Sequence, residues 1–236
     1  MQIIWDLLRK VESEPEKYIG NPSLENLFFF LSGIICYHLV DGLGVKTLPG
    51  FREYLCTKYE DPGLDFDYMH IIRMNSENEE DAFYRFYKLA KEYIKIKDSN
   101  YIPFKSIDYE EMGNGQDLER IWIILNQTYE KWNMFLGKKT LKGLENFLNG
   151  AKCYCEKKEN KTIVILPGFD EYVKIKFKDK RETSAFRVIE KNTTNASQAF
   201  ELFYELMFDF VKKMGAKYEP IVLESGEKVN MVCDII

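Results

Sequence analysis

The sequence predicts a mainly α-helical protein with a minor β component, built as two tandem pseudo-repeat domains packed together. Three observations lead to this prediction. The second half of the chain repeats the first at a shift of 117 residues, apolar residues recur at helical spacing in both halves, and short β-branched runs are typical of strands. The chain has 236 residues, 45% of them hydrophobic, which is enough to bury a core.

The repeat is carried by identical residues that follow in the same order. Positions Trp5, Leu8, Gly20, Leu24, Leu27, Phe30, Leu31 and Gly33 match Trp122, Leu125, Gly137, Leu141, Leu144, Phe147, Leu148 and Gly150. One extra residue in the second half then brings Leu-Pro-Gly-Phe at 48–51 onto the same four residues at 166–169. We therefore predict a first repeat at residues 1–117 and a second at 118–236, with the boundary in the polar, glycine-containing stretch at 110–118.

Each half predicts the same order of helices. A short helix over 5–11, or 122–129, leads to a glycine turn, and a second helix begins after Ser23 or Thr140 as N-cap. The shared apolar positions of the second helix form one stripe. A Pro-Gly-Phe turn opens a further segment at 51–59. A last helix begins after Ser76, where Glu79 completes a capping box, and its counterpart covers 195–214.

Strands are predicted in the second half. The β-branched run at 162–166 and the alternating apolar residues at 172–177 are both typical of strands. Residues 221–223 and 228–232, which flank Glu-Ser-Gly-Glu, predict a C-terminal β-hairpin.

The halves differ most clearly in the second helix. Phe28 and Phe29 are replaced by Glu145 and Asn146 in the second half, so the first-half helix is apolar nearly all round. We expect the halves to pack against each other through Phe28, Phe29 and Ile35. An exposed apolar patch for another protein is the alternative.

Charge also differs between the halves. Residues 1–117 hold 13 basic and 21 acidic residues, a net −8, whereas residues 118–236 hold 20 and 17, a net +3. The acidic residues that we expect to contact a partner are Glu60, Asp61, Asp65, Asp67, Glu77, Glu79, Glu80 and Asp81. Such a surface would attract a basic partner. The alternative is a solvated face, with acidic side chains that stabilise the first turn of a helix.

Motifs for catalysis are absent from the sequence. We find no nucleophile elbow, phosphate-binding loop, zinc-protease motif or dinucleotide fingerprint, so we expect no enzyme and no cofactor. An enzyme would have to depend on His70 or on the carboxylates Asp65 and Asp67. Two cysteines at 153 and 155 and two histidines do not make a zinc site, so we expect no metal.

Composition bears on compartment and partners. The N-terminus lacks a secretory pattern, and the longest apolar run, 27–40, is too short to cross a bilayer. Five cysteines, an odd number, indicate reduced thiols. We therefore expect a cytoplasmic protein with no membrane partner. The acidic pI of about 5.4 argues against a nucleic-acid partner, although lysines cluster at 174–181.

The first half has Lys-Tyr-Ile-Gly at 17–20, Ser-Leu at 23–24, Phe-Leu-x-Gly at 30–33 and Glu-Glu-x-Ala-Phe-x-x-Phe at 79–86, with two further short segments at 51–55 and 71–72. The second half has Met-Phe-Leu-Gly at 134–137, Thr-Leu at 140–141 and Phe-Leu-x-Gly at 147–150. These segments resemble immunity proteins of bacterial polymorphic toxin and contact-dependent inhibition systems, which open with Met-Tyr-Leu-Gly, Ser-Leu and Phe-Leu-x-Gly-Tyr and close with an acidic Glu-x-Ala-Phe-x-x-Phe helix. The second half lacks the acidic closing segment.

The resemblance implies a cytoplasmic, non-enzymatic inhibitor that binds a cognate toxin and blocks its active site or substrate entry. The acidic first half would suit a basic toxin, such as a nuclease. The alternative is a two-domain adaptor or scaffold that binds other proteins. The oligomeric state and the half that makes contact stay open at this point.

Overall fold

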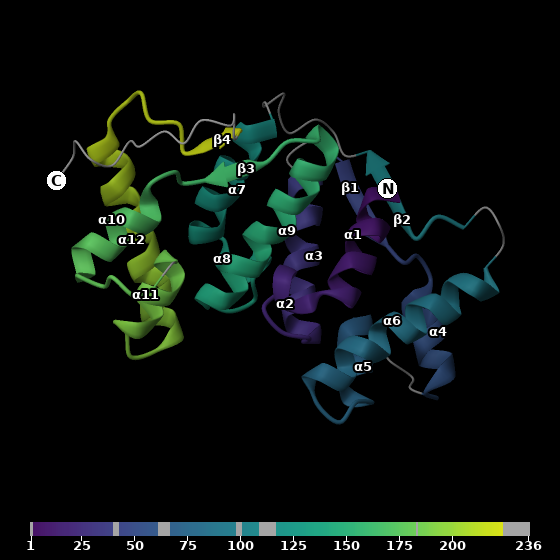
Figure 1. Cartoon of the computed structure of the whole chain (residues 1–236). Coiled ribbons are helices and arrows are strands. Elements are labelled where there is room, and N and C mark those ends of the chain that lie inside the picture. Colours follow the sequence, from purple (N-terminus) through teal and green to yellow (C-terminus); the bar gives the residue numbers. More distant parts are fainter. Residues whose placement is uncertain are drawn as a thin grey trace.

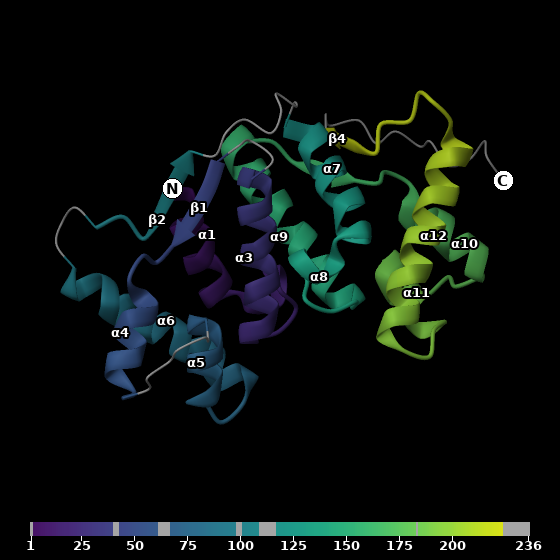
Figure 2. The ribbon, with the colours of Figure 1, turned by 180° about the vertical axis from the view of Figure 1, so that it is seen from behind.

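The computed structural model describes residues 2–39, 43–60, 67–97, 101–108, 117–182 and 184–223. Over these residues the protein is mainly helical and carries two small antiparallel sheets, which confirms the predicted fold class at this level. Figures 1 and 2 show two helices side by side in the centre, with the remaining helices of each half on opposite sides of this pair.

The order of elements in the first half recurs in the second. The first half contains α1 (Gln2–Ser13), α2 (Pro15–Tyr18), α3 (Leu24–Leu39), β1 (Leu43–Thr47), α4 (Phe51–Lys58), α5 (Tyr68–Met74), α6 (Glu79–Ile96) and β2 (Phe104–Asp108). The second contains α7 (Asp117–Glu130), α8 (Trp132–Phe135), α9 (Leu141–Glu159), β3 (Ile163–Ile165), α10 (Phe169–Phe177), α11 (Ala185–Lys191), α12 (Ala196–Met214) and β4 (Ile221–Leu223).

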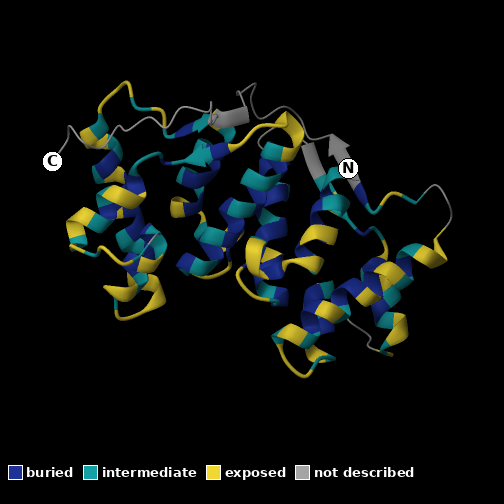
Figure 3. Cartoon of the chain, viewed as in Figure 1, coloured by how far each residue is buried: buried dark blue, intermediate teal, exposed yellow. Residues whose placement is uncertain are grey.

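The central helices are α3 and α9, which make the largest contact between any two described elements. Helix α1 of the first half packs on α9, and α7 of the second half packs on α3. Each central helix also contacts the long last helix of its own half, α6 or α12. Figure 3 shows mostly buried or partly covered residues along α3 and α9, and more exposed residues on the outer helices.

Side chains cap the helices where the sequence places them, with one correction. Ser23 Oγ accepts the N–H of Asn26, and Thr140 Oγ1 accepts the N–H of Gly143, which confirms both predicted N-caps. The predicted start of α6 is two residues early. Asn78 is the cap, because its side chain accepts the N–H of Asp81.

The Pro-Gly-Phe turns bring the chain to the start of α4 and α10 through left-handed glycines. Gly50 and Gly168 have φ of +80° and +84°, a region that glycine enters without steric cost. The leucine two residues before each glycine donates its backbone N–H to a proline carbonyl near the end of the same half. Leu48 donates to the carbonyl of Pro103 at 2.7 Å, and the second half repeats this bond between Leu166 and Pro220 at 2.6 Å.

The strand predictions are partly wrong. Residues 163–165 form β3 as predicted, but 172–177 lie in helix α10, whose Phe169 and Val173 are buried one turn apart. The segment 221–223 is a strand, yet its partner is β3, with Val164 opposite Val222. Residues 228–232 of the predicted hairpin lie outside the described residues. Strands β1 and β2 of the first half were missed because their pairing joins segments far apart in the chain.

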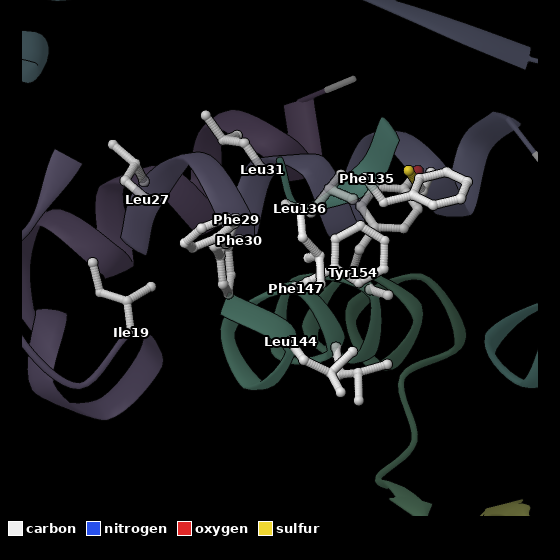
Figure 4. Packing of buried hydrophobic residues seen from close by; sticks show 14 of the residues in the cluster. Ile19, Leu27, Phe29, Phe30, Leu31, Phe135, Leu136, Leu144, Phe147 and Tyr154 are labelled. Carbon is white, nitrogen blue, oxygen red and sulfur yellow. The ribbon is translucent and has the colours of Figure 1, made fainter. Parts of the chain in front are cut away.

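The two central helices cross at a pair of glycines. A Cβ on Gly33 would fall 1.8 Å from the carbonyl oxygen of Phe147, and a Cβ on Gly150 would fall 1.9 Å from that of Phe30. Only hydrogen on these Cα atoms permits this backbone approach. Figure 4 shows Phe29 and Phe30 pointing from α3 toward α9. At the shift of 117 residues Gly33 matches Gly150, and Phe30 matches Phe147.

The contacts around the crossing modify the predicted interface. Phe29 is buried, with its ring next to Gly143 of α9, as expected. Phe28 is 38% exposed, and Ile35 is half-buried. Phe28 therefore lies at the edge of the contact, where it lines a hollow together with residues 136–138 of the second half. At the other end of the helices, Tyr37 donates to Cys155 Sγ at 3.5 Å, and the rings of His38 and Tyr154 meet edge to face.

One buried side chain of α9 is a polar amide. Asn146, which occupies the position of Phe29 in the second half, is fully buried, and neither its Nδ2 nor its Oδ1 has a hydrogen-bond partner among the described residues. A buried polar group without a partner costs free energy relative to an apolar one.

Replacement of Gly33 by Ala is expected to lower the free energy of unfolding by about 3 kcal/mol or more, because the added methyl collides with a backbone carbonyl of α9. Gly150→Ala should have the same effect. Urea unfolding followed by circular dichroism measures both. Ser32→Ala, on the same helix, is the control and should stay within about 0.5 kcal/mol of the parent. Equal stability of Gly33→Ala and the parent would contradict the close crossing.

Asn146→Leu is expected to raise the free energy of unfolding by about 1–2 kcal/mol, since it removes an unpartnered amide from the interior. The reciprocal change, Phe29→Asn, should lower it by about 3 kcal/mol because it removes buried apolar contacts and adds an orphan amide. Thermal and urea unfolding of the two variants test this pair. A loss of stability in Asn146→Leu would show that the amide is satisfied in solution.

Candidate partner-binding surface

Six of the eight acidic residues expected at a partner interface lie in the described part of the chain. Asp61 and Asp65 lie outside it. Glu60 ends the turn after α4, Asp67 precedes α5, and the other four, Glu77, Glu79, Glu80 and Asp81, lie at the start of α6. The helices α4, α5 and α6 pack on one another, so these six residues lie in neighbouring elements of the first half.

Glu79 holds three helix ends together. Its carboxylate accepts the N–H of Glu25 at 2.9 Å, the hydroxyl of Ser23 at 3.1 Å and the guanidinium of Arg73 at 2.6 Å. Partial burial acts to raise the pKa of Glu79, but these bonds from the backbone of Glu25, from Arg73 and from Ser23 outweigh it and lower the pKa. The first role of Glu79 is therefore structural, because it ties α3, α5 and α6 together.

Asp81 and Asp67 also cap helices. Asp81 accepts the N–H of Glu77 at 3.0 Å and pairs with Arg85 at 2.9 Å, and these bonds lower its pKa. Asp67 is the N-cap of α5 and accepts the N–H of His70 at 2.8 Å through Oδ1. Unlike Asp81, Asp67 has no cation paired with it among the described residues.

The remaining three carboxylates, Glu60, Glu77 and Glu80, are exposed and belong to no ion pair of the described part of the chain. Glu60 has a left-handed backbone with φ of +53°. The exposure of these three side chains agrees with contact to a basic partner surface. It agrees equally well with the alternative, a charged face that is covered only by solvent.

A hollow of about 270 Å³ lies where the first half meets the second. Its walls are Phe28 and Phe29 of α3, Met69 and His70 of α5, and the segment 136–138 after α8, with Glu25, Asp67 and Arg73 as further lining residues. Glu25 pairs with Lys138 at 2.6 Å and so joins the two halves beside this hollow. We call it the junction hollow.

The junction hollow contains residues that the sequence prediction missed. Asp67 was among the eight acidic candidates, and Phe28 was expected either between the halves or in an exposed apolar patch, whereas Glu25 and Lys138 were not predicted. A signal for them exists in the repeat, because Glu25 and Phe28 are replaced by Lys142 and Glu145 in the second half. Positions where the halves disagree in charge or polarity point to this place.

A larger hollow of about 730 Å³ lies between α6 and its neighbours α1 and α4. Its lining alternates in charge, with Lys58 paired to Glu92 and Lys91 paired to Glu12, both at 2.6 Å. Tyr84 is exposed at its side. Two of the acidic residues of the first half, Glu12 and Glu92, are therefore paired with lysines at this hollow.

Part of the lysine-rich stretch at 174–181 is internally neutralised. Lys174 pairs with Glu171, and Lys176 pairs with Asp209 at 3.2 Å. Bonds from Tyr172 and Lys176 lower the pKa of Asp209 to about 2. Such pairing reduces the positive field that a nucleic acid would meet.

Buried titratable groups lie near the crossing of α3 and α9. Burial, with smaller contributions from Lys158 and Arg120, lowers the pKa of His38 to about 4, so its imidazole is neutral at pH 7. Burial raises the pKa of Cys36 to about 12 and that of Cys153 to about 11. These thiols stay protonated and are poor nucleophiles. Within the described residues, no three His, Cys, Asp or Glu side chains gather as a metal site.

Comparison with protein-family models, with curated proteins and with solved structures finds no match to this chain. No helix among the described residues combines the length and apolar character that spanning a bilayer requires.

Glu79→Gln is expected to lower the free energy of unfolding by about 1 kcal/mol at pH 7, discounted for its solvent exposure, because a neutral amide accepts weaker bonds from Glu25 N–H and Arg73. The folded-state pKa of Glu79 is lowered, so the carboxylate stabilises the fold fully above its unfolded pKa of ~4.3 and loses this effect as pH falls through the folded pKa. The difference between parent and variant should therefore shrink toward acid pH.

Urea unfolding at a series of pH values measures this difference. Glu80→Gln, one residue along and free of ion pairs in the described structure, is the control and should match the parent. A Glu79→Gln effect that does not change between neutral and acid pH would contradict the assigned role of the carboxylate.

Proposed function

We propose that the protein is an immunity protein that binds a cognate bacterial toxin and neutralises it by stoichiometric occlusion. The observation that carries the proposal is the outer face of α4–α6, where Glu60, Glu77 and Glu80 stand exposed and free of ion pairs among the described residues. This face borders the junction hollow, which Asp67 lines. A rigid acidic surface beside an apolar recess suits recognition of a basic protein.

We further propose that the chain is two pseudo-repeat domains, residues 1–117 and 118–236, packed together. The matching order of elements supports this organisation. So does the reciprocal contact at the crossing, since Gly33 meets Phe147 just as Gly150 meets Phe30. Each domain uses the same helix face to cover the other, which leaves the outer helices of both domains available for partners.

Inhibition would need no chemistry from the chain. Carboxylates on a fixed scaffold raise the rate of association with a basic toxin, and apolar contacts slow its release. A basic active-site rim, as in a nuclease, would be covered once the acidic face docks on it. The inhibitor would work in the cytoplasm, where the producing cell must be protected.

An adaptor that holds two partners is the second candidate, and one observation favours it. The ion pair of Glu12 and Lys91 in the first half is replaced in the second by Tyr129 and Phe208, which are 39% and 42% exposed and in ring contact at 5.8 Å. Equivalent faces of the two halves thus carry unlike chemistry, which suits unlike partners.

Co-expression with the product of the neighbouring gene tests the leading proposal. We expect that product to be toxic when expressed alone, harmless when co-expressed, and to elute with this protein as a complex of equal stoichiometry. The charge-reversed variant Glu77→Lys, Glu80→Lys should associate about tenfold more slowly at low salt. Stopped-flow mixing measures the rate.

Glu219→Lys, an exposed reversal in the second half, is the control and should leave the association rate near that of the parent. A neighbouring product that is harmless by itself would overturn the immunity proposal. Two independent binding events to unlike proteins, measured by calorimetry, would support the adaptor instead.

A further inference from the structure

Some residues that line the junction hollow have counterparts at the shift of 117 residues. Among these counterparts, a lysine of the chain lies over a glycine. Lys142 lies over Gly20, where a Cβ would fall 2.5 Å from the lysine Nζ, and it pairs with Glu145 at 3.0 Å. The ammonium group thus occupies the space above a glycine whose φ is +81°.

The matching position Gly137 is less crowded. Apart from its two chain neighbours, Leu136 and Lys138, no described residue has an atom within 4 Å of the place of a Cβ on Gly137. Glu25 replaces the lysine, Phe28 replaces Glu145, and Asp67 stands as N-cap where the second half has Ser184. The position that carries a lysine in one half thus carries a glutamate in the other, and the hollow there is lined by Glu25, Asp67 and Phe28 together with the paired cations Lys138 and Arg73.

We propose that the junction hollow binds a lysine side chain of the protein partner. Its alkyl stem packs along Phe28 and Leu136, as Lys and Arg stems do on apolar surfaces, and its ammonium group meets the carboxylates of Asp67 and Glu25. The face of Phe28, 38% exposed, adds a cation–π attraction.

The charges around the hollow favour this occupant. Two cations line it, Lys138 and Arg73, and each already has a carboxylate partner, Glu25 at 2.6 Å and Glu79 at 2.6 Å. Asp67 is left without a paired cation among the described residues, and His70 is the other titratable lining group. An incoming ammonium group pairs with the carboxylate of Asp67, whereas an acidic side chain would be repelled by that carboxylate.

Size agrees with a single side chain. The hollow measures about 270 Å³, below the roughly 300–1,000 Å³ typical of small-molecule and cofactor sites. An anchor side chain that enters a recess at the centre of an interface is the usual form of a binding hot spot. This inference rests on the proposed immunity function and on the proposed pairing of the two domains.

The first experiment probes the hollow directly in the full-length protein. Nα-acetyl-lysine amide is titrated while the methyl resonance of Met69 is followed by NMR, with Nα-acetyl-norleucine amide as the uncharged probe of matched stem. We expect a saturable shift with the lysine amide only. Asp67→Asn, which keeps an N-cap, should weaken this binding about tenfold, and Glu219→Gln, an exposed change in the second half, should leave it unchanged. No shift, or equal shifts with both probes, would overturn the proposal.

The second experiment asks whether the toxin uses the hollow. The variant Glu25→Lys, Phe28→Glu, Lys138→Asn transplants the residues of the second-half site, so that the chain fills the hollow with its own lysine. It should fold with the stability of the parent and bind the neighbouring gene product at least about tenfold more weakly. The reverse transplant, Asn21→Lys, Lys142→Glu, Glu145→Phe, should leave that binding unchanged.

The outcomes separate the two proposals. A transplant variant that folds and binds the toxin as tightly as the parent overturns the lysine site and leaves the immunity function standing. A parent protein that binds the lysine amide at Met69 but not the neighbouring product overturns the immunity function and retains the lysine site.

Discussion

The arrangement of the molecule depends on one close approach, the crossing of α3 and α9 at Gly33 and Gly150. Because each glycine lies against a backbone carbonyl of the opposite helix, any side chain there would separate the helices. Around this crossing α1 contacts α9, α7 contacts α3, and Phe29 is buried against Gly143. The junction hollow is lined by Phe28 and Phe29 of the same helix α3.

Beside this contact the two halves carry different residues. The glycines of the crossing recur in both halves, whereas the second half has Lys142, Glu145 and Asn146 where the first has Glu25, Phe28 and Phe29. Among the described residues, Lys142 lies over Gly20 and pairs with Glu145, whereas Glu25 pairs with Lys138. The amide of Asn146 is buried without a hydrogen-bond partner in the described part of the chain, which costs free energy relative to the apolar Phe29 at the matching position.

The acidic residues show why sequence alone could not separate structural from available charge. Glu79 and Glu80 are neighbours with the same charge, yet Glu79 binds Ser23, Glu25 and Arg73 whereas Glu80 faces solvent. The helical period says that adjacent residues point in different directions, but which direction meets α3 depends on how α6 packs. In the sequence, Lys174 and Lys176 likewise indicate a basic patch. In the structure they pair with Glu171 and Asp209.

The sequence by itself determined the two central helices and the long last helix of each half, the N-caps Ser23 and Thr140, and the shared glycines, because these depend on local spacing and on neighbours within a turn. It did not determine the pairing of β1 with β2, the helical state of 172–177, or the exposure of Phe28. Those were decided by tertiary structure, since strand pairing joins distant segments and the burial of a side chain depends on which helix lies opposite. The position of Lys142 over Gly20 is of this second kind.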